Sequence, residues 1–122
     1  MKILEIIDKY VELNIRYENL KKEIAKCSVK GKNEELSSLE PLLENTSIAL
    51  IDIDTMYNES LEKLTTVEKI NVLGLLNAKV ISLTEEDESK ETIKRAHQYN
   101  AFFKQIDSVL SQETLERNNQ VK

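Results

Sequence analysis

The stretch that decides the fold is residues 36–64, LSSLEPLLENTSIALIDIDTMYNESLEKL. Apolar or small residues recur there in steps of three and four: Leu36, Leu39, Leu43, Thr46, Leu50, Ile53, Tyr57, Ser60 and Leu64. This spacing keeps one face of a helix against a partner. A second row, Leu42, Ala49 and Met56, widens the apolar face. A face this wide favours packing in a bundle, so we expect the C-terminal half of the chain to cover the second row.

A matching helix is predicted upstream, over residues 3–27. Its seam is Ile3, Ile6, Tyr10, Leu13, Tyr17, Leu20, Ile24 and Cys27, flanked by Ile7, Val11 and Ile15. The turn is SVKGKN, residues 28–33, where Gly31 can adopt the left-handed conformation and Asn33 can cap the next helix. Residues 1–33 carry eight basic and five acidic side chains, whereas residues 34–64 carry one and eight. We therefore expect these two oppositely charged helices to pair antiparallel.

The start of the central helix is ambiguous because of Pro41. Proline lacks an amide hydrogen and costs about 3 kcal/mol inside a helix. Ser38 as the N-cap places Pro41 in the first turn, while Ser37 with Glu40 offers a competing capping box. The strong helix is thus predicted to start at Ser37 or Ser38 and end near Leu64, with residues 33–37 as a separate turn or a kinked leader.

Two more helices are predicted downstream. Thr65 with Glu68 forms a capping box at the start of a helix that is apolar on most sides to Leu83, which indicates a buried helix. Gly74 marks a close approach to a neighbour or a weak point, and residues 79–83 permit a strand as an alternative. Thr84 is predicted to cap the last helix, whose first turn holds the acidic run at 85–88. The stripe of that helix is Thr92, Ala96, Tyr99, Phe103, Ile106 and Leu110.

Together these elements predict an all-α fold, an antiparallel up-down four-helix bundle with three long helices and one short one. We predict a single domain over residues 1–117 and a frayed tail at 118–122. Only two glycines and one proline interrupt the 122 residues, which agrees with an all-α class. Part of the long seams is expected to stay open for a partner or for self-association.

Composition excludes several classes of protein. The single cysteine, Cys27, excludes an internal disulfide and a cysteine-built zinc site. Glu5 and Asp8 interrupt the apolar N-terminal run, which breaks the pattern of a secretory signal. The longest apolar segment, residues 70–83, contains Lys79 and is too short to span a membrane. We expect a soluble, cytoplasmic protein with no membrane contact.

The acidic cluster Glu85, Glu86, Asp87, Glu88 and Glu91 is the best candidate for binding a divalent metal. Asp87, Glu88 and Glu91 resemble the first half of the Glu-Glu-x-x-Glu motif of all-α nucleoside triphosphate pyrophosphohydrolases. The resemblance implies a metal-dependent nucleotide hydrolase. It fails in the second half, Glu-x-x-Asp, because Lys104 stands where a glutamate should precede Asp107. We prefer to interpret the cluster as a solvated helix N-terminus.

Other reactive side chains have plain structural interpretations. His97 has no carboxylate or nucleophile within helical reach and is interpreted as a residue at the edge of the core. Cys27 is interpreted as a small core residue. Asp52 and Asp54 point to different sides of a helix; we expect Asp52 to face solvent and Asp54 to pair with a basic group upstream. The lysines Lys21, Lys22, Lys26 and Lys30 leave open a nucleic-acid accessory factor, but they lack interleaved aromatic residues.

In size, acidity and helical content the chain resembles small bacterial secretion chaperones and adaptors, including flagellar export chaperones. Phe103 with Asp107 resembles the Phe-x-x-x-Asp signature of helical partner proteins in type VII secretion, although the Trp-x-Gly turn of those relatives is missing. The Ile, Lys and Asn content is typical of an AT-rich bacterium or its phage. We predict no catalytic, cofactor-binding or metal-binding residues. The predicted function is a non-enzymatic adaptor, chaperone or inhibitor that binds another protein or a second copy of itself.

Overall fold

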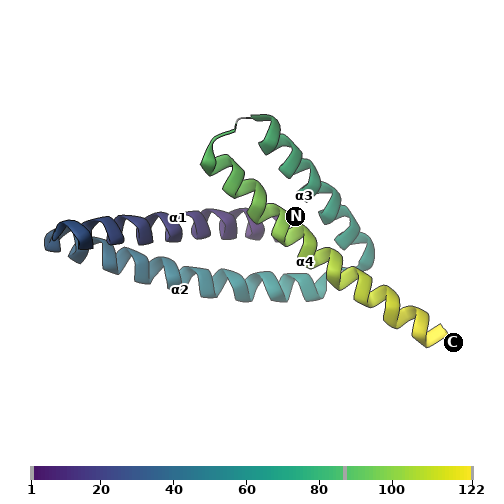
Figure 1. Ribbon diagram of the computed structural model, residues 1–122. Coiled ribbons are helices and arrows are strands. Elements are labelled where there is room, and N and C mark those ends of the chain that lie inside the picture. The colour runs from purple at the N-terminus through teal and green to yellow at the C-terminus, as the bar shows by residue number, and fades with distance from the viewer. Residues whose placement is uncertain (1, 87, 122) are drawn as a thin grey trace. The chain divides into compact units, whose positions relative to one another are not determined.

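The computed structural model describes residues 2–86 and 88–121, and the side chains of residues 3–86 and 88–117. These residues form four helices and no strand: α1 (Lys2–Lys30), α2 (Asn33–Lys63), α3 (Thr66–Glu86) and α4 (Lys90–Val121) (Figure 1). The all-α class is confirmed. Helices of 29, 31 and 32 residues beside one of 21 also confirm three long helices and a short one. The strand alternative for residues 79–83 is wrong, because they lie inside α3.

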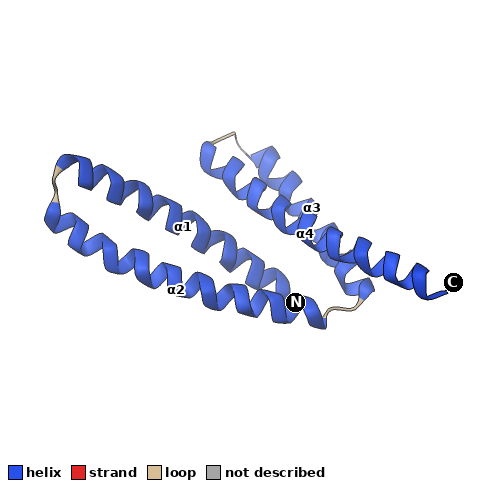
Figure 2. Ribbon diagram, turned by 60° about the horizontal axis from the view of Figure 1, so that its bottom comes forward, coloured by secondary structure: helices blue, strands red, loops and turns tan. Residues whose placement is uncertain are grey.

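The chain divides into two compact units, Met1–Asn58 and Glu59–Lys122. The first holds α1 and most of α2, and the second holds the last turn of α2 with α3 and α4. Short loops connect the helices, and each unit is built on one antiparallel helical hairpin (Figure 2). The predicted single domain over residues 1–117 and the predicted fraying of residues 118–122 stay predictions.

The turn between α1 and α2 closes as the sequence predicts. Gly31 has a φ of 70°, in the left-handed region that glycine adopts without a steric penalty. Its amide donates to the Ser28 carbonyl at 3.3 Å, and the Lys32 amide donates to the Cys27 carbonyl at 3.0 Å. This pair of bonds is the Schellman motif, which satisfies the last carbonyls of a helix. The next helix begins directly, at Asn33.

Up to Tyr57, the two predicted seams form the interior of the α1–α2 hairpin, whereas Ser60 and Leu64 belong to the second unit. All 17 seam positions are buried or half-buried, and Ile53 and Tyr57 are among the most deeply buried side chains. Near the turn, the Cys27 thiol donates to the Glu35 carboxylate at 3.3 Å. Far from the turn, the Tyr10 hydroxyl donates to Asp54 at 2.9 Å. Contacts at both ends of the hairpin confirm that α1 and α2 pair antiparallel.

The predicted start of the central helix is wrong. α2 begins at Asn33 and runs without interruption through Pro41, the ninth residue of the helix. Neither Ser37 nor Ser38 caps a helix; their hydroxyls donate to the carbonyls of Asn33 and Glu34, one turn earlier. The Gly31 turn delivers the chain in helical conformation at Asn33, so the helix is nucleated before Pro41. Pro41 cannot donate one backbone hydrogen bond, but the hydrogen bonds of the helical turns on both sides outweigh that loss.

The α3–α4 hairpin starts with the predicted capping box. The Thr65 amide donates to the Glu68 carboxylate at 3.0 Å, and the Glu68 amide donates to the Thr65 hydroxyl at 3.1 Å. The bonds from Thr65 lower the pKa of Glu68. Further along, the Lys79 ammonium lies over the Tyr99 ring, 5.7 Å from its centroid. Lys69, earlier in α3, pairs with Glu113, later in α4, so the two helices run antiparallel.

The predicted start of α4 is wrong by several residues. Thr84 lies inside α3, which continues to Glu86, and its hydroxyl donates to the Ile81 carbonyl at 2.8 Å. The N-cap of α4 is Ser89, whose hydroxyl accepts the Thr92 amide at 3.2 Å. Ser and Thr side chains cap helices in the same way, so local sequence does not distinguish Thr84 from Ser89.

The prediction that the third helix is buried on most sides is also wrong. Only one face of α3 is buried: Lys69, Val72, Leu76 and Leu83. Large apolar side chains on its other faces are exposed: Val67, Ile70, Leu75 and Ile81. Apolar composition alone does not say which faces of a helix find a neighbour.

Candidate functional site

An apolar groove runs between the two helices of the α1–α2 hairpin. Its volume is about 430 Å³, and its lining consists of Leu13, Arg16 and Leu20 from α1 with Leu42, Asn45, Thr46 and Ala49 from α2. Four of the seven side chains are aliphatic. The Thr46 hydroxyl donates to the Leu42 carbonyl at 2.7 Å, so its polar group is already satisfied inside α2. The groove therefore offers mainly apolar surface.

The groove lies along the second apolar row of α2, and the expectation that the C-terminal half of the chain covers this row stays a prediction. Leu42 is 52% exposed and Met56 is 49% exposed, while Ala49 between them is half-buried. A large apolar side chain exposed alone is ordinary, but several in one row beside a groove are a feature of binding surfaces. This row is the apolar surface that the sequence predicted and for which the α1–α2 hairpin supplies no cover.

One cation borders the groove. Arg16 is exposed and is the only charged residue in the lining. Its guanidinium presents several donors in a fixed plane that suits a carboxylate. A ligand of this groove therefore needs apolar side chains for the floor and a carboxylate for the Arg16 edge.

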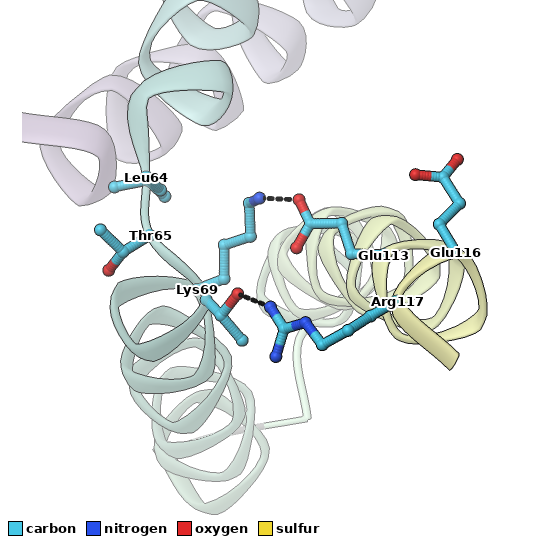
Figure 3. Close-up of a pocket in the computed structure, with 7 residues that line it drawn as sticks. Leu64, Thr65, Lys69, Glu113, Glu116 and Arg117 are labelled. Carbon is cyan, nitrogen blue, oxygen red and sulfur yellow. Dashed lines mark hydrogen bonds and ion pairs between the residues drawn. The ribbon is translucent and has the colours of Figure 1, made fainter. Parts of the chain in front are cut away.

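A second, polar crevice lies within the α3–α4 hairpin (Figure 3). Its volume is about 310 Å³, and it is lined by Leu64, Thr65, Thr66, Lys69, Glu113, Glu116 and Arg117. The Lys69 ammonium donates to the Glu113 carboxylate, and the Arg117 guanidinium donates to the Thr66 hydroxyl at 3.4 Å. One ion pair and one hydrogen bond therefore join α3 to α4 beside the crevice.

Sequence reasoning missed the buried pair in this crevice. Lys69 is 4% exposed, and burying an ammonium ion requires a partner of opposite charge. The signal was present: Lys69 lies on the same face of α3 as Val72, Leu76 and Leu83. A lysine in the register of a buried apolar stripe indicates a partner on the opposing helix.

The structure distributes the acidic cluster over three elements instead of one helix start. Glu85 and Glu86 end α3, Glu88 lies in the loop, and Glu91 is in the first turn of α4, where Arg95 donates to it at 3.3 Å. Asp87 lies outside the described residues. Within residues 2–86 and 88–121, no group of three or more His, Cys, Asp or Glu side chains is placed to hold a metal ion.

Asp52 and Cys27 fall where the structural interpretations placed them, but His97 lies outside the edge of the core and Asp54 has another partner. His97 and Asp52 are exposed, and Cys27 is buried. Burial, and then the Glu35 carboxylate, raise the pKa of the Cys27 thiol, which favours the unreactive protonated form. Asp54 pairs with the Tyr10 hydroxyl and not with the expected basic group.

The lysine-rich end of α1 makes local contacts. The Lys21 ammonium lies over the Tyr17 ring, 5.3 Å from its centroid. Lys26 lies 3.8 Å from Glu23, and Lys32 lies 3.7 Å from Glu35 across the turn. These exposed pairs are of the kind that contributes little to stability.

No helix in the described part of the chain is both long enough and apolar enough to cross a membrane. The chain matches no protein-family model, no curated protein and no solved structure.

Proposed function

We propose that this protein is a non-enzymatic helical module that binds another protein, as an adaptor, chaperone or inhibitor. The observation that carries the proposal is the apolar groove of the α1–α2 hairpin with the exposed row Leu42, Ala49 and Met56 beside it. Two packed helices with an apolar groove between them are the usual receptor for the apolar face of a third helix.

The chemistry of the groove specifies its ligand. Leu13, Leu20 and Leu42 suit apolar side chains spaced three and four residues apart on one face of a helix. Arg16 at the border suits a carboxylate next to that face. The proposed ligand is therefore an amphipathic helix of a partner protein, with an acidic residue on one edge of its apolar stripe.

A displayed library of helical peptides, selected against the full chain, tests this. We expect the selected peptides to carry apolar residues at helical spacing with a flanking Asp or Glu. Leu42→Glu should abolish their binding, and Arg16→Glu should shift the selection toward a flanking Lys or Arg. Val29→Glu is the matched control, because Val29 is an exposed apolar residue of α1 that does not line the groove.

Two results would refute the proposal. One is a selection without any amphipathic pattern. The other is binding that survives Leu42→Glu as well as it survives Val29→Glu, which would place the ligand elsewhere on the surface.

A further inference from the structure

The outer face of α3 carries an exposed stripe, made of Val67, Ile70, Gly74, Ala78 and Ile81 and called here the α3 stripe. All five residues are exposed. Their spacing of three, four, four and three places them on one face of the helix, opposite the buried face that includes Val72 and Leu76. α3 thus packs against α4 on one side and presents a second apolar seam on the other.

The α3 stripe is symmetric about its centre. Gly74 is the midpoint, so two antiparallel copies of α3 that cross there place Val67 opposite Ile81 and Ile70 opposite Ala78. Gly74 then lies opposite its own copy. Such a self-complementary surface is what a two-fold symmetric contact requires, because each residue must meet its counterpart twice. We propose that the α3 stripe binds the α3 stripe of a second copy of this chain, antiparallel, with the two-fold axis at Gly74.

Gly74 supports this assignment. Glycine weakens a helix relative to alanine, and a Cβ placed at Gly74 meets no atom of the described residues within 4 Å. Packing within the chain therefore gives no reason for a glycine at this position. At a two-fold crossing the reason is direct, because two glycines allow the backbones of the paired helices to approach closely.

Charge selects the antiparallel orientation. Glu85 and Glu86 are the last two residues of α3, and both are exposed. In an antiparallel pair Glu85 and Glu86 of each copy lie near the positive end of the other α3. In a parallel pair the like charges would lie side by side, which is unfavourable.

The length of the α3 stripe sets the expected affinity. Val67 and Ile81 lie about 21 Å apart along the helix, at ~1.5 Å per residue. Two helices in contact over this length bury less surface than the ~1,200 Å² of standard stable interfaces. We therefore expect a weak dimer with a dissociation constant in the micromolar range, formed at high local concentration.

Sedimentation equilibrium of the full chain, from about 1 μM to about 1 mM, tests this inference. We expect a monomer–dimer equilibrium. Gly74→Glu should weaken it at least tenfold, because it places two carboxylates at the axis, while glutamate supports the helix better than glycine. Leu75→Glu is the matched control, since Leu75 is its exposed neighbour outside the α3 stripe, and it should leave the dimer unchanged.

Two further variants test geometry and orientation. In a Cys27→Ser background, Gly74→Cys should form a disulfide-linked dimer under mild oxidation, and Leu75→Cys should not. Glu85→Lys should weaken the dimer, because it places a cation at the positive end of the other α3. A wild-type chain that stays monomeric throughout would overturn the inference, and so would a dimer that Gly74→Glu leaves intact.

The inference belongs to the same class of function as the proposed one, protein binding by helices, but uses a different surface. Leu42→Glu should leave the dimer unchanged. Loss of the dimer in Leu42→Glu would place the contact in the groove and overturn the α3 assignment. A monomeric chain that still binds amphipathic peptides would overturn only the dimer.

Discussion

The Tyr10 hydroxyl donates a hydrogen bond of 2.9 Å to Oδ1 of Asp54, a residue 44 positions further along the chain. The Tyr10 ring also meets the Tyr57 ring edge to face, with 6.3 Å between the centroids and an angle of 85° between the planes. Aromatic pairs of this geometry are favourable beyond the area they bury. Tyr10 of α1 thus contacts Asp54 and Tyr57, which lie about one turn apart on α2, at the end of the hairpin away from the Gly31 turn.

Because of this cluster, we expect the stability of the protein to fall at strongly alkaline pH. Burial, with the Asp54 carboxylate as a further cause, raises the pKa of Tyr10 from 10.0 to about 12, and burial likewise raises the pKa of Tyr57 to about 12. The folded state therefore holds these protons more tightly than the unfolded chain. This contribution to stability is fully present below pH 10 and is lost as the pH rises to about 12.

Ultraviolet absorbance of tyrosinate, recorded with circular dichroism during an alkaline titration, measures this effect. We expect two tyrosines to ionise together with the loss of helix. Asp54→Asn removes the charge but not the burial, so it should lower the pKa of Tyr10 only in part. Ionisation of all four tyrosines near pH 10 in the folded protein would contradict the prediction.

The central seam predicts a sharp contrast between two substitutions in α2. Ile53 is 3% exposed, so Ile53→Asp loses about 1.5–3 kcal/mol of apolar burial and adds the larger cost of an unpaired buried charge. We expect it to abolish cooperative thermal unfolding. Glu44→Lys, at an exposed position of the same helix, should change the free energy of unfolding by less than about 0.5 kcal/mol. Equal effects from the two would mean that the seam is misassigned.

The buried Lys69–Glu113 pair predicts that replacing the glutamate lowers stability more than replacing the lysine. Glu113→Gln leaves the buried Lys69 ammonium without its carboxylate and should lower the free energy of unfolding by about 1–3 kcal/mol. Lys69→Met removes the buried charge itself and should be close to neutral or stabilising. Denaturant unfolding measures both variants.

The control for this pair is Glu91→Gln. Arg95 and Glu91 form an exposed pair within α4, whose loss should cost less than about 0.5 kcal/mol. A larger loss from Lys69→Met than from Glu113→Gln would show that the lysine stabilises the fold through more than its ion pair.

The proline inside α2 predicts a stabilising substitution. Pro41 is exposed and lies in a continuous helix, where proline costs about 3 kcal/mol relative to alanine. Part of that cost is offset because proline also restricts the unfolded chain. Pro41→Ala should therefore raise the free energy of unfolding by about 1–2 kcal/mol. Glu40→Ala, the exposed neighbour, is the control and should have little effect; a destabilised Pro41→Ala variant would contradict the prediction.

The sequence was a good guide where a local pattern determines the structure alone. The seams of α1 and α2, the Gly31 turn and the Thr65 capping box each follow from spacing or from a hydrogen bond within a few residues. The start of α2 differs from the prediction because the Gly31 turn begins the helix at Asn33, so Pro41 does not determine where it starts. The start of α4 was mispredicted because Thr84 and Ser89 offer similar caps.

The faces of the helices that stay exposed were beyond local reasoning. Leu42 and Val67 have the same apolar character as side chains that are buried, and only the arrangement of neighbouring helices separates the two groups. The crevice at Lys69 was missed for a related reason. Its partner Glu113 lies 44 residues away, and no pattern within α3 identifies it.

The Gly31 turn also sets the order in which structure forms during synthesis. Because the loop is short, contacts beside it, such as that of Cys27 with Glu35, are close in sequence, and such local contacts form fast. Helices form within about a microsecond, whereas a ribosome adds ~5–20 residues per second. The α1–α2 hairpin, with its groove, is thus expected to exist for seconds before α4 is made. During that interval a helix of a partner protein would find the groove already open.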